Sequence, residues 1–175
     1  GQLGIGLSAT KVSQPTALGY TGTLAGHHLV ALSAGASHAL ALSAEGRVFA
    51  WGDNTSGKLG YGGGDASRNA PVAVATAGVL AGKTIVAIAA GAGHSLALGS
   101  DGQLYAWGDN SANQLGVSGL AASYTPVVVD RGALGNATVV AIAAGSSHNL
   151  ALTTDGRLFA WGRGLSGELG TGLAA

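Results

Sequence analysis

The sequence contains no cysteine, no methionine and little charge. A chain without cysteine forms no disulfide, no thiolate nucleophile and no zinc site of the cysteine type. Only 9% of the residues are charged, with eight basic and eight acidic side chains that cancel. Nucleic acids and anionic membrane surfaces are bound by clustered Lys and Arg, so we expect neither as a partner. Because position 1 also lacks methionine, we expect a processed chain or a piece of a longer one.

Long apolar runs and helical periodicity are missing as well. The most apolar stretch, residues 71–93, contains Lys83 and falls short of the roughly 20 uninterrupted apolar residues that a membrane helix needs, so we expect no membrane insertion. The 32 glycines interrupt nearly every segment, which argues against a helical solenoid. A hydrophobic fraction of 47% nevertheless indicates a folded chain, because disordered chains combine low hydrophobicity with high charge.

A repeat of about 55 residues dominates what is present. Four markers recur in register: a His that opens an apolar run, a Gly after an acidic residue, a Trp before Gly, and a Leu before Gly. These structural repeat positions are His38, His94 and His148; Gly46, Gly102 and Gly156; Trp51, Trp107 and Trp161; and Leu59, Leu115 and Leu169. Such a period outranks any local motif in assigning a fold. We therefore expect one repeat domain over residues 1–175, with repeats at about 1–56, 57–112 and 113–166, and a fourth beginning at 167–175.

Each repeat reads as four short strands. In the middle copy, residues 84–90, 94–98 and 103–107 are short apolar runs, and the second and third are joined by an Asp-Gly hairpin turn at 99–102. Residues 127–129 are the candidate fourth strand. Four strands in about 55 residues match a propeller blade, so we predict an all-β fold of about three four-stranded blades. Three blades cannot close a ring of about 4–8, which predicts a partial propeller or a self-associating open array with unpaired edges.

The three copies resemble the regulator-of-chromosome-condensation repeat, whose motif runs roughly AAGxxHSLAL, then DGxLYxWG, then GQLG. They look like a bacterial, Ala- and Gly-rich variant of it. The resemblance implies propeller blades, commonly seven to a ring. It also implies nucleotide exchange on a small GTPase as the family's best-known activity. That activity requires a charged inserted hairpin, and no insert here is charged enough to serve as one.

The grouping of His94, Ser95 and Asp101 suggests a nucleophile with its base. The sister copies hold Ala39 and Asn149 where Ser95 stands, which a catalytic serine would not allow. We therefore expect each His to bond backbone inside its own blade and each Trp to fill the space between blades with its indole N–H bonded. No catalytic residue, cofactor site or metal site is predicted. Adjacent His27 and His28 could ligate a metal, but a solvated turn is favoured because no further ligand lies nearby.

The segments that vary between copies, 5–24, 61–80 and 117–134, are candidate partner-contact loops, because loops on a rigid scaffold usually carry binding residues. The candidate contact residues are Tyr20, His27, His28, Tyr61, Asp65, Arg68, Tyr124, Asp130 and Arg131. We predict a non-enzymatic structural or protein-interaction scaffold, part of a larger or self-assembling surface or filament protein, whose partner is itself or another protein. The alternatives are a propeller that binds its partner like an exchange factor or like a protein inhibitor. We expect an extracellular or cell-surface location, with a cytoplasmic one as the alternative.

Overall fold

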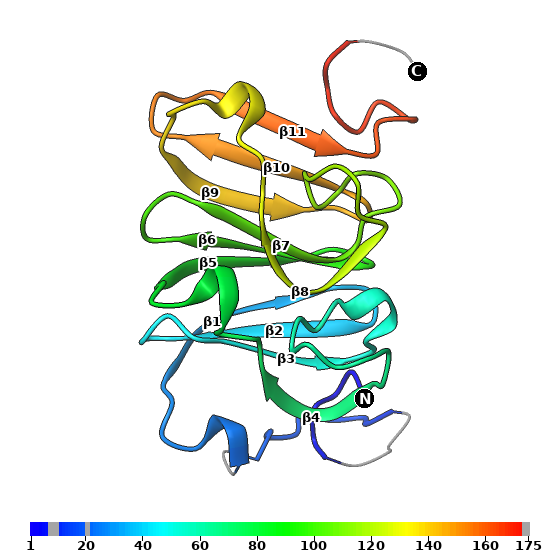
Figure 1. Ribbon diagram of the computed structural model, residues 1–175. Helices are drawn as coiled ribbons and strands as arrows, with labels where there is room; N and C mark the ends of the chain where they lie inside the picture. The colour runs from blue at the N-terminus through cyan, green and yellow to red at the C-terminus, as the bar shows by residue number, and fades with distance from the viewer. Residues whose placement is uncertain (7–10, 20–21, 173–175) are drawn as a thin grey trace.

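The computed structural model describes residues 1–6, 11–19 and 22–172, and its ribbon is a stack of three antiparallel sheets (Figure 1). The predicted all-β propeller class is confirmed. The first sheet pairs β1 (Leu29–Ala34), β2 (His38–Ser43), β3 (Val48–Gly52) and β4 (Arg68–Ala73) in that order. The second pairs β5 (Ile85–Ala90), β6 (His94–Gly99), β7 (Leu104–Asp109) and β8 (Ala122–Val128). The third pairs β9 (Val139–Ala144), β10 (His148–Thr153) and β11 (Leu158–Gly162).

The inner three strands of each sheet follow from local sequence. Short apolar runs supply the strands, and the hairpin between β6 and β7 turns at Gly102, which has a φ of +75°. A side chain at that φ would be strained, which explains why a glycine stands at this point in every copy. The turn is closed by the Gly102 N–H, which donates to the Gly99 carbonyl at 2.9 Å.

The outer strand begins earlier than its sequence suggests. The sequence predicts residues 127–129 as the fourth strand of the middle repeat, whereas β8 runs from Ala122 to Val128 and includes Pro126. Its pairing with β7 shifts register between Ala106 and Gly108. An outer strand needs ladder bonds on one side only and therefore tolerates proline and polar residues. This is why the strand extends into a segment whose sequence predicts a loop.

The hydrophobic core lies between neighbouring sheets. One cluster joins the first sheet to the second and includes Leu40, Ala50 and Leu59 from one side and Tyr105 and Trp107 from the other. A second cluster repeats this arrangement between the second and third sheets. The core thus consists of one cluster for each pair of neighbouring sheets, as in other repeat proteins.

The two ends of the stack differ from its middle. The third sheet has three strands within the part of the chain that the structure describes, and β11 forms its open edge. Leu158 in β11 is 63% exposed, whereas Leu104, at the same place in the second sheet, is 1% exposed. At the other end, residues 1–6 and 11–19 and the 3-10 helix η1 (Gly22–Leu24) lie beyond the first sheet (Figure 1). Leu18 and Leu24 from this segment pack onto that sheet.

Candidate functional site

His38 hydrogen-bonds across to the second sheet. Its Nε2 lies 2.9 Å from the Ser95 hydroxyl, and the same hydroxyl donates to the Lys58 carbonyl at 2.8 Å. Because the only hydroxyl proton of Ser95 is used on that carbonyl, Nε2 of His38 must carry the proton and donate it. All of these atoms are buried at the interface between the two sheets.

The next interface repeats the arrangement with a different residue. Nε2 of His94 lies 2.8 Å from Oδ1 of Asn149, and Nδ2 of Asn149 donates to the Gln114 carbonyl at 2.7 Å. The amide oxygen only accepts, so His94 also donates through Nε2. We call this set the clasp: a His, the side chain directly after the His of the following sheet, and a backbone carbonyl from the segment that joins the two sheets, together with the Trp of the following sheet. Ala39, Ser95 and Asn149 occupy the clasp position, which is the residue directly after each His.

The tryptophans complete the clasp. The indole N–H of Trp107 donates to the Lys58 carbonyl at 2.9 Å, and that of Trp161 donates to the Gln114 carbonyl at 3.2 Å. Trp51 donates in the same way to the Gln2 carbonyl at 3.0 Å. A Cβ built on Gly60 would lie 2.6 Å from the Trp107 indole nitrogen, so only glycine fits beneath the ring. The Leu-Gly marker that follows the third strand of one sheet therefore packs directly under the Trp of the next sheet.

This geometry excludes the serine-histidine chemistry that the sequence suggests. Ser95 is fully buried and hydrogen-bonds the histidine of the neighbouring repeat, not its own neighbour His94. A histidine that donates to the hydroxyl cannot take its proton as a general base. Burial, followed by the nearby Lys58 ammonium and His94, lowers the pKa of His38 to about 4, and burial also lowers the pKa of His94. Both rings are therefore neutral structural donors at neutral pH.

The expected partner of these histidines was wrong, because the ring bonds a side chain of the next sheet and not backbone inside its own blade. The expected bonded indoles between blades are present. One signal for the clasp was available in the sequence. The position after each His changes between copies while its surroundings stay the same, as expected of a contact that is matched separately at each interface.

A second polar pair recurs five residues apart and was not foreseen. Lys58 donates to Asp53 at 2.6 Å, and Gln114 donates to Asp109 at 2.6 Å. The third copy reverses the order, with Arg163 lying 3.6 Å from Glu168. Burial opposes ionisation of Asp53, but hydrogen bonds from Lys58 and Thr55 outweigh it and lower its pKa to about 2. In all three copies the pair therefore links the two ends of the loop that follows the third strand.

Several candidate contact residues instead tie loops of this chain together. His27 lies 3.3 Å from Glu45 in the first hairpin, as Lys83 lies 2.8 Å from Asp101 in the second. His27 therefore occupies the place of a salt-bridging lysine. Arg131 donates to the carbonyls of Gly102, Gly135 and Ala137.

Four further candidate contact residues also contact other residues of this chain, and two others are exposed. Tyr124 lies in β8 and donates to Asp65 at 2.8 Å, while the Arg68 guanidinium in β4 stacks 4.6 Å above the Tyr61 ring. These contacts hold the outer strands and their loops. His28 and Asp130 are exposed, and Tyr20 lies outside the described residues.

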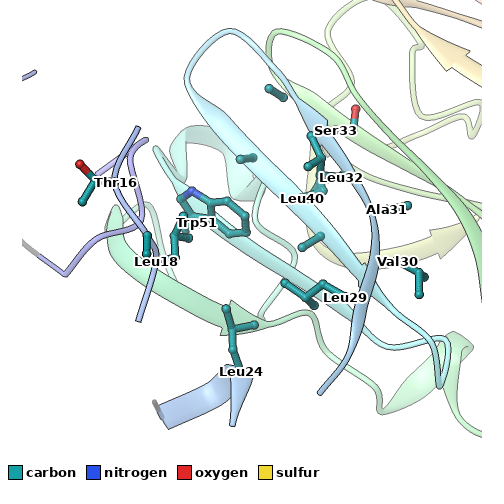
Figure 2. Close-up of a pocket in the computed structure, with 14 residues that line it drawn as sticks. Thr16, Leu18, Leu24, Leu29, Val30, Ala31, Leu32, Ser33, Leu40 and Trp51 are labelled. Carbon is teal, nitrogen blue, oxygen red and sulfur yellow. The ribbon is translucent and has the colours of Figure 1, made fainter. Parts of the chain in front are cut away.

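A large apolar hollow lies on the outward face of the first sheet. It has a volume of about 710 Å³ and is lined by β1, β2, Trp51 and the segment that carries Leu18 and Leu24. Figure 2 shows Leu18 beside Trp51, with Leu24 on the same side of the hollow, across from Leu29 to Ser33. Leu32 is 81% exposed on this face. The surface is apolar and belongs to a sheet whose other face is already covered by the second sheet.

No group of three or more possible metal-ligating side chains occurs in residues 1–6, 11–19 and 22–172. Across the same ranges, no helix has the length and apolar character needed to cross a bilayer.

The amino-acid sequence was compared with known protein families. The regulator of chromosome condensation (RCC1) repeat matches residues 45–98 and 101–152. A second pattern of the same repeat matches residues 29–58, 85–114 and 139–168. The chain belongs to the RCC1 repeat family. The matched segments contain the histidines and tryptophans of the clasp, so the contacts between sheets lie within what defines the repeat.

Known RCC1-repeat proteins resemble the chain over most of its length. It is 40% identical over 173 residues to the human probable E3 ubiquitin-protein ligase HERC6, covering 97% of this chain and 16% of the ligase. It is 32% identical to human HERC2, of which it covers 4%. The structure of Prp20p from Saccharomyces cerevisiae matches with a TM-score of 0.82 and 30% identity, covering 98% of this chain and 41% of Prp20p. The chain thus spans a small part of the ligases and less than half of Prp20p.

These relatives correct one expectation. The predicted extracellular or cell-surface location is wrong, because ubiquitin ligases and a yeast protein that binds Gsp1p and histones act inside cells. These relatives are human and yeast proteins, which gives no support to a bacterial variant of the RCC1 repeat.

Proposed function

We propose that the chain is a non-enzymatic, protein-binding scaffold whose three sheets are consecutive blades of a propeller that further blades of the same repeat type complete. The outward face of the first sheet is the observation that supports this function most strongly. The predicted repeats at about 1–56, 57–112 and 113–166, with a fourth beginning at 167–175, are part of the proposal. Ligase activity is not included, because the chain covers only 4% and 16% of the two ligases.

The argument compares equivalent positions in the innermost strands. Ile88 in β5 packs into the cluster shared with the first sheet, and Ile142 in β9 packs into the cluster shared with the second. Leu32 occupies the same place in β1 and is 81% exposed. A large apolar side chain exposed on an apolar sheet face marks an interaction surface. Its two sister positions are each covered by another blade, so a blade is also the occupant that fits Leu32.

The test is self-association of the whole chain, because a second copy also presents blades. Sedimentation velocity up to about millimolar concentration is expected to show association for the wild-type chain and its loss in Leu32→Lys. Ser100→Lys adds the same charge on the hairpin of the middle sheet, away from both end faces, and should associate like the wild type. Circular dichroism establishes that both variants are folded. A wild-type chain that stays folded and monomeric throughout contradicts the proposal.

A second candidate is binding of a small GTPase in the manner of an exchange factor. It is favoured by the match over 98% of the chain to Prp20p, a protein that binds Gsp1p. Release of labelled guanine nucleotide from a small GTPase, measured with and without the chain, tests it. Release at the intrinsic rate at saturating chain concentration rejects this candidate and leaves the scaffold proposal intact.

A further inference from the structure

The residue at the clasp position is polar in the second and third sheets and apolar in the first, and this difference bears on which blade the first sheet can accept as its neighbour. Ser95 and Asn149 each accept a hydrogen bond from the histidine of the preceding sheet and donate to a backbone carbonyl. The first sheet carries Ala39 at this position. The Ala39 methyl group can neither accept nor donate a hydrogen bond. The outward face of the first sheet therefore lacks the side chain that would pair with the histidine of a preceding blade.

The rest of the clasp is intact on that face. Trp51 is in place and donates to the Gln2 carbonyl at 3.0 Å, just as Trp107 donates to Lys58 at 2.9 Å. A Cβ on Gly4 would lie 2.7 Å from the Trp51 ring, as tight as the contact between Gly60 and Trp107. The first sheet is therefore built to receive a blade, and only the acceptor for a histidine is missing.

The third sheet presents the opposite half. His148 begins β10 as His38 begins β2, and its ring lies against Gly145 as the His94 ring lies against Gly91. Within the described residues no further sheet covers β10, and His148 is half-buried. When a blade covers this face, the ring nitrogen that donates at the other two interfaces needs an acceptor from that blade.

We propose that the outward face of the first sheet accepts a blade that has no histidine at the place of His38, and that it discriminates against the third sheet of a second copy of this chain. In such a pair of copies, residues 168–170 of one copy would take the place that residues 2–4 hold under Trp51 of the other. The His148 N–H of the first copy would then be buried opposite the Ala39 methyl group of the second. The inference rests on the proposed function, because it assumes that the end faces take blades in the same register as the internal interfaces.

The expected size of the discrimination follows from the unpaired donor. Leaving a buried donor without a partner weakens an interface by roughly five- to a hundred-fold in dissociation constant. Self-association of the wild-type chain is therefore expected to be weak. It should strengthen when either the acceptor is supplied or the donor is removed.

The experiment is a double-mutant cycle on the dissociation constant of self-association, measured by sedimentation with folding checked by circular dichroism. Ala39→Asn supplies the acceptor that the third sheet already uses at Asn149, and His148→Leu removes the donor. Each single variant should associate at least about fivefold more tightly than the wild type. In the double variant, the second change should add no gain, since an Asn without its histidine is left half-bonded.

Two matched controls separate the clasp from apolar contact. Ala39→Val enlarges the side chain without an acceptor and should not strengthen association. Leu32→Lys placed in the Ala39→Asn background should abolish it, which locates the contact on the proposed face. The inference is overturned if the wild type associates through Leu32 and Ala39→Asn binds no more tightly, an outcome that leaves the proposed function standing. If the wild type stays folded and monomeric up to about millimolar concentration, the proposed function fails, and the inference fails with it.

Discussion

At the scale of single residues, histidines that could serve in catalysis elsewhere have packing and hydrogen-bonding roles in this chain. His38 and His94 are buried, neutral and bonded through Nε2, and Nδ1 of each has no partner within the described residues. Their rings fit because a glycine stands three residues earlier, at Gly35 and Gly91. A buried His at this position of the repeat therefore requires a glycine three residues before it and a hydrogen-bond acceptor on the next sheet.

Gly91→Ala should destabilise the fold. A Cβ there would overlap Cε1 of His94 and lie 2.7 Å from the Gly145 carbonyl oxygen, so both the ring and the third sheet would have to shift. Overpacking of this kind costs about 1–3 kcal/mol in the free energy of unfolding. Urea denaturation followed by circular dichroism measures it. Gly64→Ala is the control, because nothing lies within 4 Å of its added Cβ. Equal midpoints for the two variants would show that the turn at Gly91 has room.

The buried histidines predict a loss of stability in mild acid. Burial lowers the pKa of His38 to about 4 in the folded chain, against 6.5 for the free side chain. The unfolded state therefore binds more protons between these values, and stability present above pH 6.5 falls as the pH drops toward 4. Each such histidine contributes at most about 1.4 kcal/mol per pH unit.

Urea midpoints between pH 7.5 and 4.5 test this dependence. His38→Gln keeps a donor for Ser95 but removes the titrating ring, so its midpoint should fall less steeply with pH. His28→Gln removes an exposed histidine and should follow the wild-type curve. Parallel curves for wild type and His38→Gln would assign the acid sensitivity to other groups.

At the scale of strands and loops, elements that depend on local sequence could be predicted, and those that depend on contacts between distant residues could not. The inner strands and their hairpins could be predicted from sequence, because short apolar runs and an acidic-Gly turn are local signals. The outer strand of the middle repeat was predicted only at its end, as residues 127–129. The earlier part of β8 contains Tyr124 and Pro126 and is specified by pairing with β7. The clasp was also missed. Its partners lie 57 and 55 positions apart, so only the stacking of sheets brings them together.

The pair five residues apart predicts which substitutions at Lys58 are tolerated. Lys58→Gln reproduces the second copy, where Gln114 bonds Asp109 at 2.6 Å, and should cost less than about 1 kcal/mol in unfolding free energy. Lys58→Leu removes the donor and leaves Asp53 without its strongest partner, so it should cost about 1–3 kcal/mol. Urea denaturation of both variants at pH 7 measures the difference. A Gln variant as unstable as the Leu variant would mean that the charge of Lys58, and not its hydrogen bond, holds the loop.

At the scale of the whole molecule, the chain is a one-dimensional array in which each sheet is stabilised by its neighbours. The middle sheet is covered on both faces, and every residue of β6 is buried. Among the described residues, the third sheet is covered on one face and its strand β11 is paired on one side. In such arrays, stability is a sum over units and interfaces, so the ends open more readily than the middle.

Amide hydrogen exchange at pH 7 should show this gradient. The strands β3 and β11 share the sequence Phe-Ala-Trp-Gly and act as a matched pair. The strand β3 is fully buried and paired on both sides, whereas β11 is partly exposed and, within the ranges that the structure describes, paired with β10 alone. The β11 amides should exchange about tenfold faster or more, and those of β6 and β7 should be the slowest. Equal protection of β3 and β11 would mean that the three sheets open as one unit, and the single exposed face of the third sheet would then have no effect on its stability.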